Sequence, residues 1–258
     1  QYILNETDAN THGYVCCDTE PVLEKELAQR AGLGWIGKNS LLLNPKWGSL
    51  FNLGELFLNI ELPVSQIEVK DLCFNCSLCI QSCPTNCIEI DRTLKADHCI
   101  SYLTIEHRKS IPKELRPLMD AWIYGCDICQ LICPWNQKFF QEMDSQIEKT
   151  QKYSEHRPIQ GTQFLLENSG LSFMHKRNMR KKVLRNFSIC LGNTHQQEAI
   201  QPLTNLLNER EAEIRASVAW ALGQIPCPQS KELLIYQLKI EGEPAVIEEI
   251  NQSLEKFN

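Results

Sequence analysis

Residues 73–84 read CFNCSLCIQSCP, a run of four cysteines with the spacing Cys-x2-Cys-x2-Cys-x3-Cys followed by a proline. This is the spacing of the bacterial cysteine run that binds [4Fe–4S] clusters, in which the fourth cysteine serves a second cluster. Short spacings let successive thiolates point into one pocket. Proline ends the run because it fixes φ and has no amide hydrogen. The stretch therefore predicts a bacterial-ferredoxin-like module with two clusters.

A second, split run completes the expected ligand set. Residues 126–134 read CDICQLICP and lack a cysteine just before Cys126, which Cys99 can supply across an expected helix, Pro112 to Trp122. Crossing the runs then gives one cluster Cys73, Cys76, Cys79 and Cys133, and the other Cys83, Cys99, Cys126 and Cys129. Cys87 is left over as a buried spare. The alternative is a pair of zinc sites, but zinc usually pairs two CxxC units across a longer loop, so the spacing favours clusters.

Composition indicates a folded protein of several domains. The chain has 258 residues, of which 43% are hydrophobic and 22% charged, and a net charge of −6 argues against indiscriminate nucleic-acid binding. No apolar run approaches the roughly 18–20 residues of a membrane span, and the opening QYILNETDAN does not read as a signal peptide. We therefore expect a cytoplasmic protein, away from membranes, whose 13 cysteines indicate metal binding or catalysis before disulfides.

The C-terminal region repeats. RKKVLRNFSICLGN (180–193) aligns with EIRASVAWALGQ (213–224), pairing Val183 with Ile214 and Gly192 with Gly223, and a partial third unit begins near Pro244. Second helices are expected over Glu198–Leu207 and Lys231–Ile240. Paired helices at this spacing predict a HEAT-like α-solenoid, in which each pair needs a neighbour to bury its apolar face. An ordinary helical bundle stays open as an alternative because only two full units are visible.

These features predict a multidomain α+β fold. Residues 1–70 are expected to be the later part of an α/β domain with a helix over Glu20–Arg30, and the lack of an initiator methionine suggests that it begins partway through a longer protein. The cluster module is expected over 71–136, a linker over 137–163 and the HEAT-like repeats over 164–258.

Four stretches carry a resemblance to a known family. They are CCDTEPVLEKELAQRAGLGWIGKNSLLLNPKWGS (16–49), HCISYLTIEHR (98–108), IYGCDICQLICPWN (123–136) and, in the repeats, KRNMRKKVLRNFSICLGN (176–193). Together with the cysteine runs they resemble the epoxyqueuosine reductase family, which is related to reductive dehalogenases. The resemblance implies an α/β cobalamin-binding domain and two [4Fe–4S] clusters. It also implies the last step of queuosine synthesis, in which Co(I) cobalamin fed by the clusters reduces an epoxide at the tRNA wobble position to the alkene.

The resemblance also implies roles for single residues. Asp18 matches the family's proton donor and a corrinoid contact, whereas its sequence context alone favours a helix N-cap. The remaining expected corrinoid contacts are Lys38, Asn39, Ser40, Ser101, Tyr102 and Asp127. The glycines of GLGWIGKNS (32–40) would let the backbone approach this ligand closely.

A run of basic residues suggests a surface for phosphates. The expected tRNA contacts are Lys176, Arg177, Arg180, Lys181, Arg185 and, from the cluster module, Arg108. On a helix, Arg177, Lys181 and Arg185 would share a face opposite Val183 and Phe187. Such a stripe suits phosphates, although a solvated helix face is the plainer alternative. The expected partners are a tRNA with a GUN anticodon carrying epoxyqueuosine and an unidentified electron donor.

Two other functions stay open from the sequence. One is a corrinoid and iron–sulfur reductase of a small molecule, which would not need a basic solenoid. The other is a non-catalytic electron-transfer ferredoxin fused to an interaction solenoid, which would need neither Asp18 nor the glycine-rich stretch.

Overall fold

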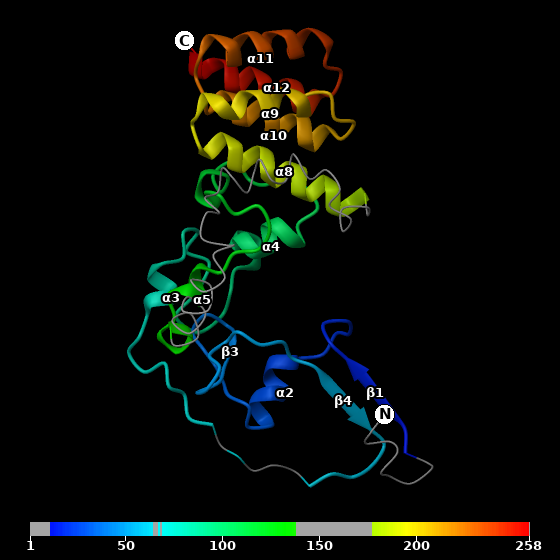
Figure 1. Ribbon diagram of the computed structural model, residues 1–258, viewed down its shortest axis with the longest axis vertical. Helices are drawn as coiled ribbons and strands as arrows, with labels where there is room; N and C mark the ends of the chain where they lie inside the picture. The colour runs from blue at the N-terminus through cyan, green and yellow to red at the C-terminus, as the bar shows by residue number, and fades with distance from the viewer. Residues whose placement is uncertain (1–10, 64–66, 68, 138–176, 258) are drawn as a thin grey trace, which may run out of the picture. The chain divides into compact units, whose positions relative to one another are not determined.

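The computed structural model describes residues 11–63, 67, 69–137 and 177–257. The chain divides into two compact units, which are described separately (Figure 1). Unit 1 comprises residues up to 95 together with 128–149, and unit 2 comprises 96–127 together with the residues from 150 onward. The linker expected over 137–163 lies outside the described residues apart from its first position. Among the described helices, none has the length and apolarity that crossing a membrane requires.

Unit 1 contains two small antiparallel sheets and a short helix. Strand β1 (Gly13–Cys16) pairs with β4 (Glu55–Leu58), with Cys16 opposite Glu55. Strand β2 (Trp35–Ile36) pairs with β3 (Leu42–Leu43). Helix α2 (Glu24–Arg30) begins later than the expected Glu20, because residues 17–23 form bends and an extended approach. It buries Ala28 and places acidic residues in its first turn, where they suit the helix dipole.

A short helix of unit 1 lies inside each cysteine run. Helix α3 (Leu78–Gln81) lies inside the first run, and α5 (Ile128–Leu131) lies inside the second. The two helices are neighbours, so the runs meet despite their separation in sequence (Figure 1). A small core packs against them. It consists of Trp35, Leu43 and Cys133, with Val69, Leu72, Cys73 and Trp135 packed around it.

Unit 2 contains stacked helices in the order that HEAT-like repeats require. They are α8 (Arg177–Asn193), the 3-10 turn η4 (Gln197–Ala199), α9 (Ile200–Leu206), α10 (Ala212–Gly223), α11 (Pro228–Ile240), α12 (Pro244–Leu254) and the turn η5 (Glu255–Phe257). Helix α10 is buried on nearly all sides because α8, α9, α11 and α12 all pack against it. Its sequence is correspondingly apolar or small from Ala216 to Gly223, where every residue is buried.

The repeated glycines explain the period seen in the sequence. A Cβ atom on Gly192 would lie 2.8 Å from Cα of Ala221 in α10. A Cβ on Gly223 would lie 2.7 Å from Cβ of Ser253 in α12. Each glycine therefore lets one repeat helix approach the next closely, and any larger residue would push the helices apart.

Residues 96–127 pack onto the first repeat helix. They contain the turn η1 (Ala96–His98), helix α4 (Ile100–Ile105) and the turn η2 (Pro117–Met119). The helix expected over Pro112–Trp122 is wrong, because this stretch forms turns with only η2 as regular structure. Apolar side chains from residues 96–127 join the core of the repeats; they are Ile100, Leu103, Ile111, Leu115 and Met119.

Polar side chains of α8 fix this packing. Arg185 donates hydrogen bonds to the carbonyls of Leu103, His107 and Lys109, at 2.7, 3.0 and 2.5 Å. Asn186, which is fully buried, donates to the carbonyls of Thr104 and Ile123 at 2.9 and 2.8 Å. The bonds satisfy loop carbonyls that would otherwise be buried without partners.

Candidate metal centre

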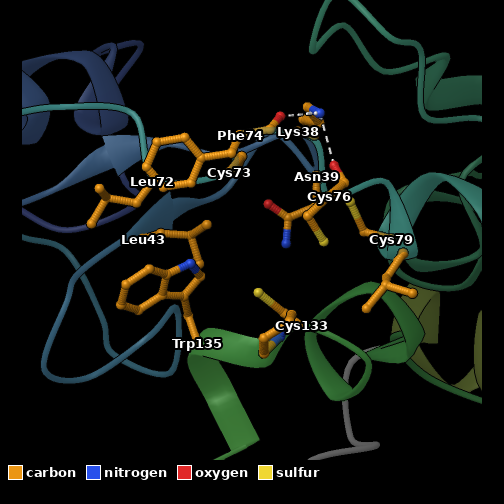
Figure 2. Close-up of a pocket in the computed structure, with 12 residues that line it drawn as sticks. Lys38, Asn39, Leu43, Leu72, Cys73, Phe74, Cys76, Cys79, Cys133 and Trp135 are labelled. Atoms are coloured by element: carbon orange, nitrogen blue, oxygen red, sulfur yellow. Dashed lines mark hydrogen bonds between the residues drawn. The ribbon is translucent and has the colours of Figure 1, made fainter.

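Four cysteines surround one cavity in unit 1. The cavity has a volume of about 280 Å³, and Cys73, Cys76, Cys79 and Cys133 all line it (Figure 2). These are the residues that the crossed ligand pattern assigns to the first cluster. Apolar side chains form much of the remaining wall; they are Leu43, Leu72, Phe74, Leu78, Pro134 and Trp135. The arrangement offers four sulfur ligands in a largely apolar enclosure.

Local backbone geometry holds the first run in place. The amide of Cys76 donates to the carbonyl of Cys73 at 2.9 Å, which closes a tight turn between these two ligands. The carboxylate of Asp71 accepts from the amide of Cys73, also at 2.9 Å. Asp71 also pairs with Arg92, whose guanidinium donates to the Ile36 carbonyl at 2.7 Å. The cysteine loop is thereby connected to strand β2.

Lys38 holds the same loop from the opposite side. Its ammonium group donates to the carbonyls of Phe74 and Cys76, at 2.8 Å each (Figure 2). These bonds place a positive charge beside the backbone carbonyls of the cysteine loop.

Asn39 supplies a polar group that faces the cavity. It is 5% exposed, lines the cavity and, among the described residues, has no hydrogen-bond partner for its Nδ2 atom. A buried amide donor without a partner costs free energy unless something accepts its hydrogen. An acceptor inside the cavity, such as a sulfide or thiolate sulfur, would satisfy it. The cavity therefore fits an iron–sulfur cluster.

The geometry argues for a cluster rather than one metal ion. No three His, Cys, Asp or Glu side chains in the described part of the chain converge on a single ion position. The four thiols instead stand around a cavity of about 280 Å³. Zinc draws its thiolates to about 2.3 Å from one centre and leaves no such space.

Several cysteines have shifted pKa values. Burial raises the pKa of the Cys79 and Cys133 thiols above the usual value. The thiol of Cys83 lies 3.4 Å from that of Cys87, and this hydrogen bond lowers the pKa of Cys83 to about 5. Cys87 is buried, as expected for a spare cysteine, and it stabilises a neighbouring thiolate.

The second expected ligand set falls in both units. Cys83 and Cys129 belong to unit 1, whereas Cys99 and Cys126 belong to unit 2. Their joint role as ligands of one cluster therefore stays a prediction from the spacing.

Asp18 is exposed and follows strand β1 in a left-handed turn, at φ 53°. Its amide donates to the carboxylate of Glu24, the first residue of α2, at 2.7 Å. The N-cap of α2 is Leu23, so the cap alternative for Asp18 does not occur. No hydrogen bond or ion pair holds the Asp18 carboxylate within the described residues.

The expected corrinoid contacts differ in their surroundings. Lys38 and Asn39 face the cysteine loop and cavity, and the Ser40 hydroxyl donates to the Arg92 carbonyl at 2.6 Å. The glycines before them serve close packing: a Cβ on Gly34 would lie 2.0 Å from the Leu43 carbonyl oxygen. The other three expected contacts belong to unit 2; they are Ser101, half-buried in α4, and the exposed Tyr102 and Asp127.

Most of the basic side chains of α8 form hydrogen bonds or ion pairs with other residues of unit 2. Arg185 is 1% exposed, so its expected role as a phosphate contact is wrong; it is buried, as Val183 and Phe187 are. Arg180 pairs with Glu209 at 2.6 Å, and Lys181 pairs with Glu213 at 2.5 Å.

The other expected tRNA contacts differ in exposure and in whether the structure describes them. Arg108 is exposed. Lys176 lies outside the described residues, and Arg177 is described only as the first residue of α8.

Sequence reasoning missed two residues of the site. The indole Nε1 of Trp35 donates to Cys73 Sγ at 3.4 Å, and the ring of Trp35 meets that of Trp135 edge-on, with centroids 5.1 Å apart. Trp135 directly follows Cys133-Pro134, so its position beside a ligand was readable. Trp35 is separated from Cys73 by 38 residues, and no local spacing signals that contact.

Comparison with known proteins agrees with the cysteine site and with the helical repeats. Residues 72–136 match the family described as a 4Fe-4S double cluster binding domain, and residues 172–255 match HEAT repeats. The chain is thus an iron–sulfur protein with HEAT repeats. It is 41% identical over 221 residues to epoxyqueuosine reductase of Escherichia coli, covering 80% of this chain and 55% of that protein. Over four fifths of its length the chain is therefore similar to epoxyqueuosine reductases.

Other relatives and solved structures have the same name. The Pseudomonas aeruginosa epoxyqueuosine reductase is 53% identical over 120 residues, which are 46% of this chain and 33% of that protein. An epoxyqueuosine reductase solved with an epoxyqueuosine-modified tRNA-Tyr stem loop matches with a TM-score of 0.82 at 27% identity, over 99% of this chain and 68% of that chain. A Bacillus subtilis epoxyqueuosine reductase, described with its catalytic aspartate loop swung out of the active site, matches with a TM-score of 0.81 at 26% identity, over 100% and 69%. The chain spans about half the length of relatives such as the E. coli enzyme.

Proposed function

We propose that this protein reduces the epoxide of epoxyqueuosine to the alkene of queuosine at the tRNA wobble position. Similarity to epoxyqueuosine reductases over four fifths of the chain supports the reaction. The observation that carries the proposal to this chain is the cavity lined by Cys73, Cys76, Cys79 and Cys133, because epoxide reduction needs an electron path. A related enzyme solved with a modified tRNA stem loop supports a tRNA substrate.

The reaction defines what the protein must supply. Converting the epoxide to the alkene takes two electrons and two protons and releases the oxygen as water. Iron–sulfur clusters supply single electrons. The four cysteine thiolates would hold one cluster, while Lys38 keeps their loop in place through the Phe74 and Cys76 carbonyls. The second cluster would take Cys83, Cys99, Cys126 and Cys129.

Asp18 is the proposed proton donor to the epoxide oxygen. It follows β1 and is exposed, and its amide donates to the Glu24 carboxylate, while its own carboxyl group has no hydrogen bond within the described residues. A positioned acid of this kind typically contributes about 10²–10⁴-fold to the rate. The relative described with its catalytic aspartate loop swung out supports an aspartate that acts from a movable turn.

Cobalamin is proposed on the family resemblance alone. The Lys38, Asn39 and Ser40 side chains are directed to the cysteine loop, the cavity and the Arg92 carbonyl, so they do not form a polar surface for a corrinoid. Retention of a corrinoid by the purified protein tests this part separately.

For tRNA, exposed cations in unit 2 are the proposed phosphate contacts. Arg108 is exposed, and Arg180 retains 48% exposure of its side chain although it pairs with Glu209. Contacts of this kind give affinity that falls steeply with salt. Arg177, Lys181 and Lys176 remain proposed members of this surface, and Arg185 is excluded by its burial.

The test is anaerobic turnover by the complete protein. The assay combines cobalamin, a strong reductant and an anticodon stem-loop carrying epoxyqueuosine, followed by mass spectrometry of the digested nucleosides. A product lighter by one oxygen atom is expected. No conversion by protein that retains its clusters and a corrinoid would overturn the proposal and favour a corrinoid reductase of a small molecule. Retention of clusters without a corrinoid would favour an electron carrier.

A further inference from the structure

The orientation of the Asn39 side chain is fixed by its own loop. Its Oδ1 atom accepts a hydrogen bond from the Leu41 amide at 3.3 Å. Only the oxygen of the amide group can accept, so the nitrogen is the atom turned toward the cavity (Figure 2). With the side chain 5% exposed, no bulk water reaches this NH2 group. Asn39 therefore presents an N–H donor to the position that a cluster would occupy.

Trp35 presents a second donor to the same site. Its indole Nε1 lies 3.4 Å from Cys73 Sγ, and the side chain is 1% exposed. The edge-on contact with Trp135 and the packing against Leu43 hold the ring in this orientation. An indole nitrogen can only donate, so the sulfur is the acceptor.

We infer that Asn39 and Trp35 donate N–H···S hydrogen bonds to the cluster held by Cys73, Cys76, Cys79 and Cys133, and that these bonds raise its reduction potential. The inference rests on the proposed cluster at these cysteines and assigns two positioning residues to it. Neither residue supplies a ligand or touches the substrate.

The direction of the effect follows from charge. On reduction the cluster gains one electron, no bond forms or breaks, and the negative charge on its sulfurs increases. The positive ends of the two N–H dipoles stabilise that added charge, and the dry, apolar wall strengthens the effect. The N–H···S bonds are stronger to the reduced cluster than to the oxidised one, so removing either donor is expected to lower the reduction equilibrium constant at least about tenfold.

Potentiometric titration of the complete, cluster-loaded protein, followed by EPR, tests the inference. The variants are Asn39→Leu, which keeps the volume but removes the donor, and Trp35→Phe, which keeps an aromatic ring but removes the N–H. With dithionite as the electron source, each variant is expected to lower one midpoint potential by at least about 59 mV, the one-electron equivalent of tenfold. The other midpoint is expected to stay unchanged.

Leu78→Val is the matched control. Leu78 lines the same cavity but carries no donor, and among the described residues it is not part of the core that packs around Trp35. Its substitution disturbs the packing of the wall without removing a hydrogen bond, so the reduction equilibrium constant is expected to stay within about twofold of that of the original protein. An equal shift in Leu78→Val would overturn the inference, because packing would then account for the effect.

A measurement on the unsubstituted protein covers the case in which a variant loses its cluster. Asparagine labelled with ¹⁵N only in the side-chain amide is incorporated, and the reduced cluster is examined by pulsed EPR. Among the described residues, Asn39 is the only asparagine that lines the cavity, so a weak ¹⁵N coupling is expected from it. No coupling in protein with full iron and sulfide content would reject the role of Asn39.

The outcomes separate this inference from the proposed function. Iron and sulfide analysis that finds no cluster at the four cysteines would overturn both. A cluster with unchanged potentials in Asn39→Leu and Trp35→Phe would overturn the hydrogen-bond inference and leave the proposed reaction standing.

Discussion

The guanidinium of Arg185 donates a hydrogen bond of 2.7 Å from Nη2 to the backbone carbonyl of Leu103. The two residues are 82 positions apart, and the bond joins the first repeat helix to the segment that carries Cys99 and Cys126. Burial lowers the pKa of Arg185 to about 10, which still leaves it charged at neutral pH. A buried cation surrounded by carbonyl groups is a structural anchor rather than a phosphate contact.

Replacing this anchor is expected to destabilise unit 2. Arg185→Met leaves three loop carbonyls without their donor, so we expect a loss of about 2–4 kcal/mol in the free energy of unfolding. Arg180→Met is the matched control, since it removes only a surface ion pair with Glu209 and should cost no more than about 1 kcal/mol. Urea unfolding followed by circular dichroism measures both. Equal losses in the two variants would contradict the anchor.

The repeat glycines should be intolerant of a single added methyl group. Gly192→Ala would place Cβ 2.8 Å from Cα of Ala221, a backbone atom that cannot move aside. Despite the better helix propensity of alanine, we expect thermal unfolding to show a destabilisation of about 1–3 kcal/mol. At Gly242 nothing lies within 4 Å of the added Cβ, so Gly242→Ala should change stability by less than about 1 kcal/mol. A neutral Gly192→Ala would refute the close packing.

Acid should weaken the repeats through Glu241. Its side chain is 3% exposed, and its hydrogen bond with Arg215 lowers the pKa of the carboxyl from 4.5 to about 2. The depressed pKa stabilises the fold above about pH 4.5 and loses that contribution as pH falls toward 2, a change of roughly 3 kcal/mol.

Glu241→Gln should therefore be less stable than the original protein at pH 6, and the difference should shrink as pH falls. Unfolding monitored at 222 nm across this range measures it. Glu243→Gln, which replaces an exposed neighbour, is expected to show a difference that is small and independent of pH. A constant difference for Glu241→Gln would contradict the assignment.

Asp18→Asn should abolish turnover without disturbing the rest of the molecule. The amide cannot donate a proton as an acid, so we expect kcat to fall about 10²–10⁴-fold. Iron and sulfide content and tRNA affinity should stay unchanged. Glu26→Gln is the control, because within the described part of the chain that half-exposed carboxylate pairs with Arg30 in α2 alone. Full activity in Asp18→Asn would remove Asp18 from the proposed mechanism.

Arg108→Glu should weaken tRNA binding by electrostatics alone. The exposed guanidinium would release about one counterion on binding a phosphate, so the slope of log affinity against log salt should fall by about 1. Filter binding or fluorescence anisotropy at several salt concentrations measures this slope. Lys46→Glu, in unit 1 beside Trp47, controls for net charge. Identical slopes in all three proteins would exclude Arg108 from the surface.

Much of the fold could be predicted from the sequence because the residues that specify it lie close together in the chain or recur at a fixed spacing. The spacing of Cys73, Cys76 and Cys79 is short enough to specify one turn, and the paired glycines 192 and 223 report equivalent helix contacts. HEAT repeats and a cluster-binding domain are both confirmed. The cysteine run also selected the thiols that line the cavity, since the second run repeats the same local turn.

The sequence-based predictions that were wrong or incomplete concern residues whose surroundings are set by tertiary contacts. The spacing of Arg177, Lys181 and Arg185 describes a face of a helix, but only the packing of residues 96–127 decides that Arg185 is covered. The glycines of residues 32–37 signal close approach without naming the neighbour, which for Gly34 is the Leu43 carbonyl. The expected helix over Pro112–Trp122 gave way to turns because its apolar residues pack into the repeat core.

The packing of residues 96–127 against α8 limits where the chain can be cut and which segments can be moved to another protein. Leu103 and Met119 are fully buried in the same core as Ile189 and Val218 of the repeats. A recombinant fragment cut at residue 164 would leave one face of α8 uncovered and would tend to aggregate. Two of the predicted cluster ligands, Cys99 and Cys126, lie at either end of the segment that covers this face. The repeats are therefore not an interchangeable module: transplanting them onto another enzyme would require carrying part of the redox domain with them.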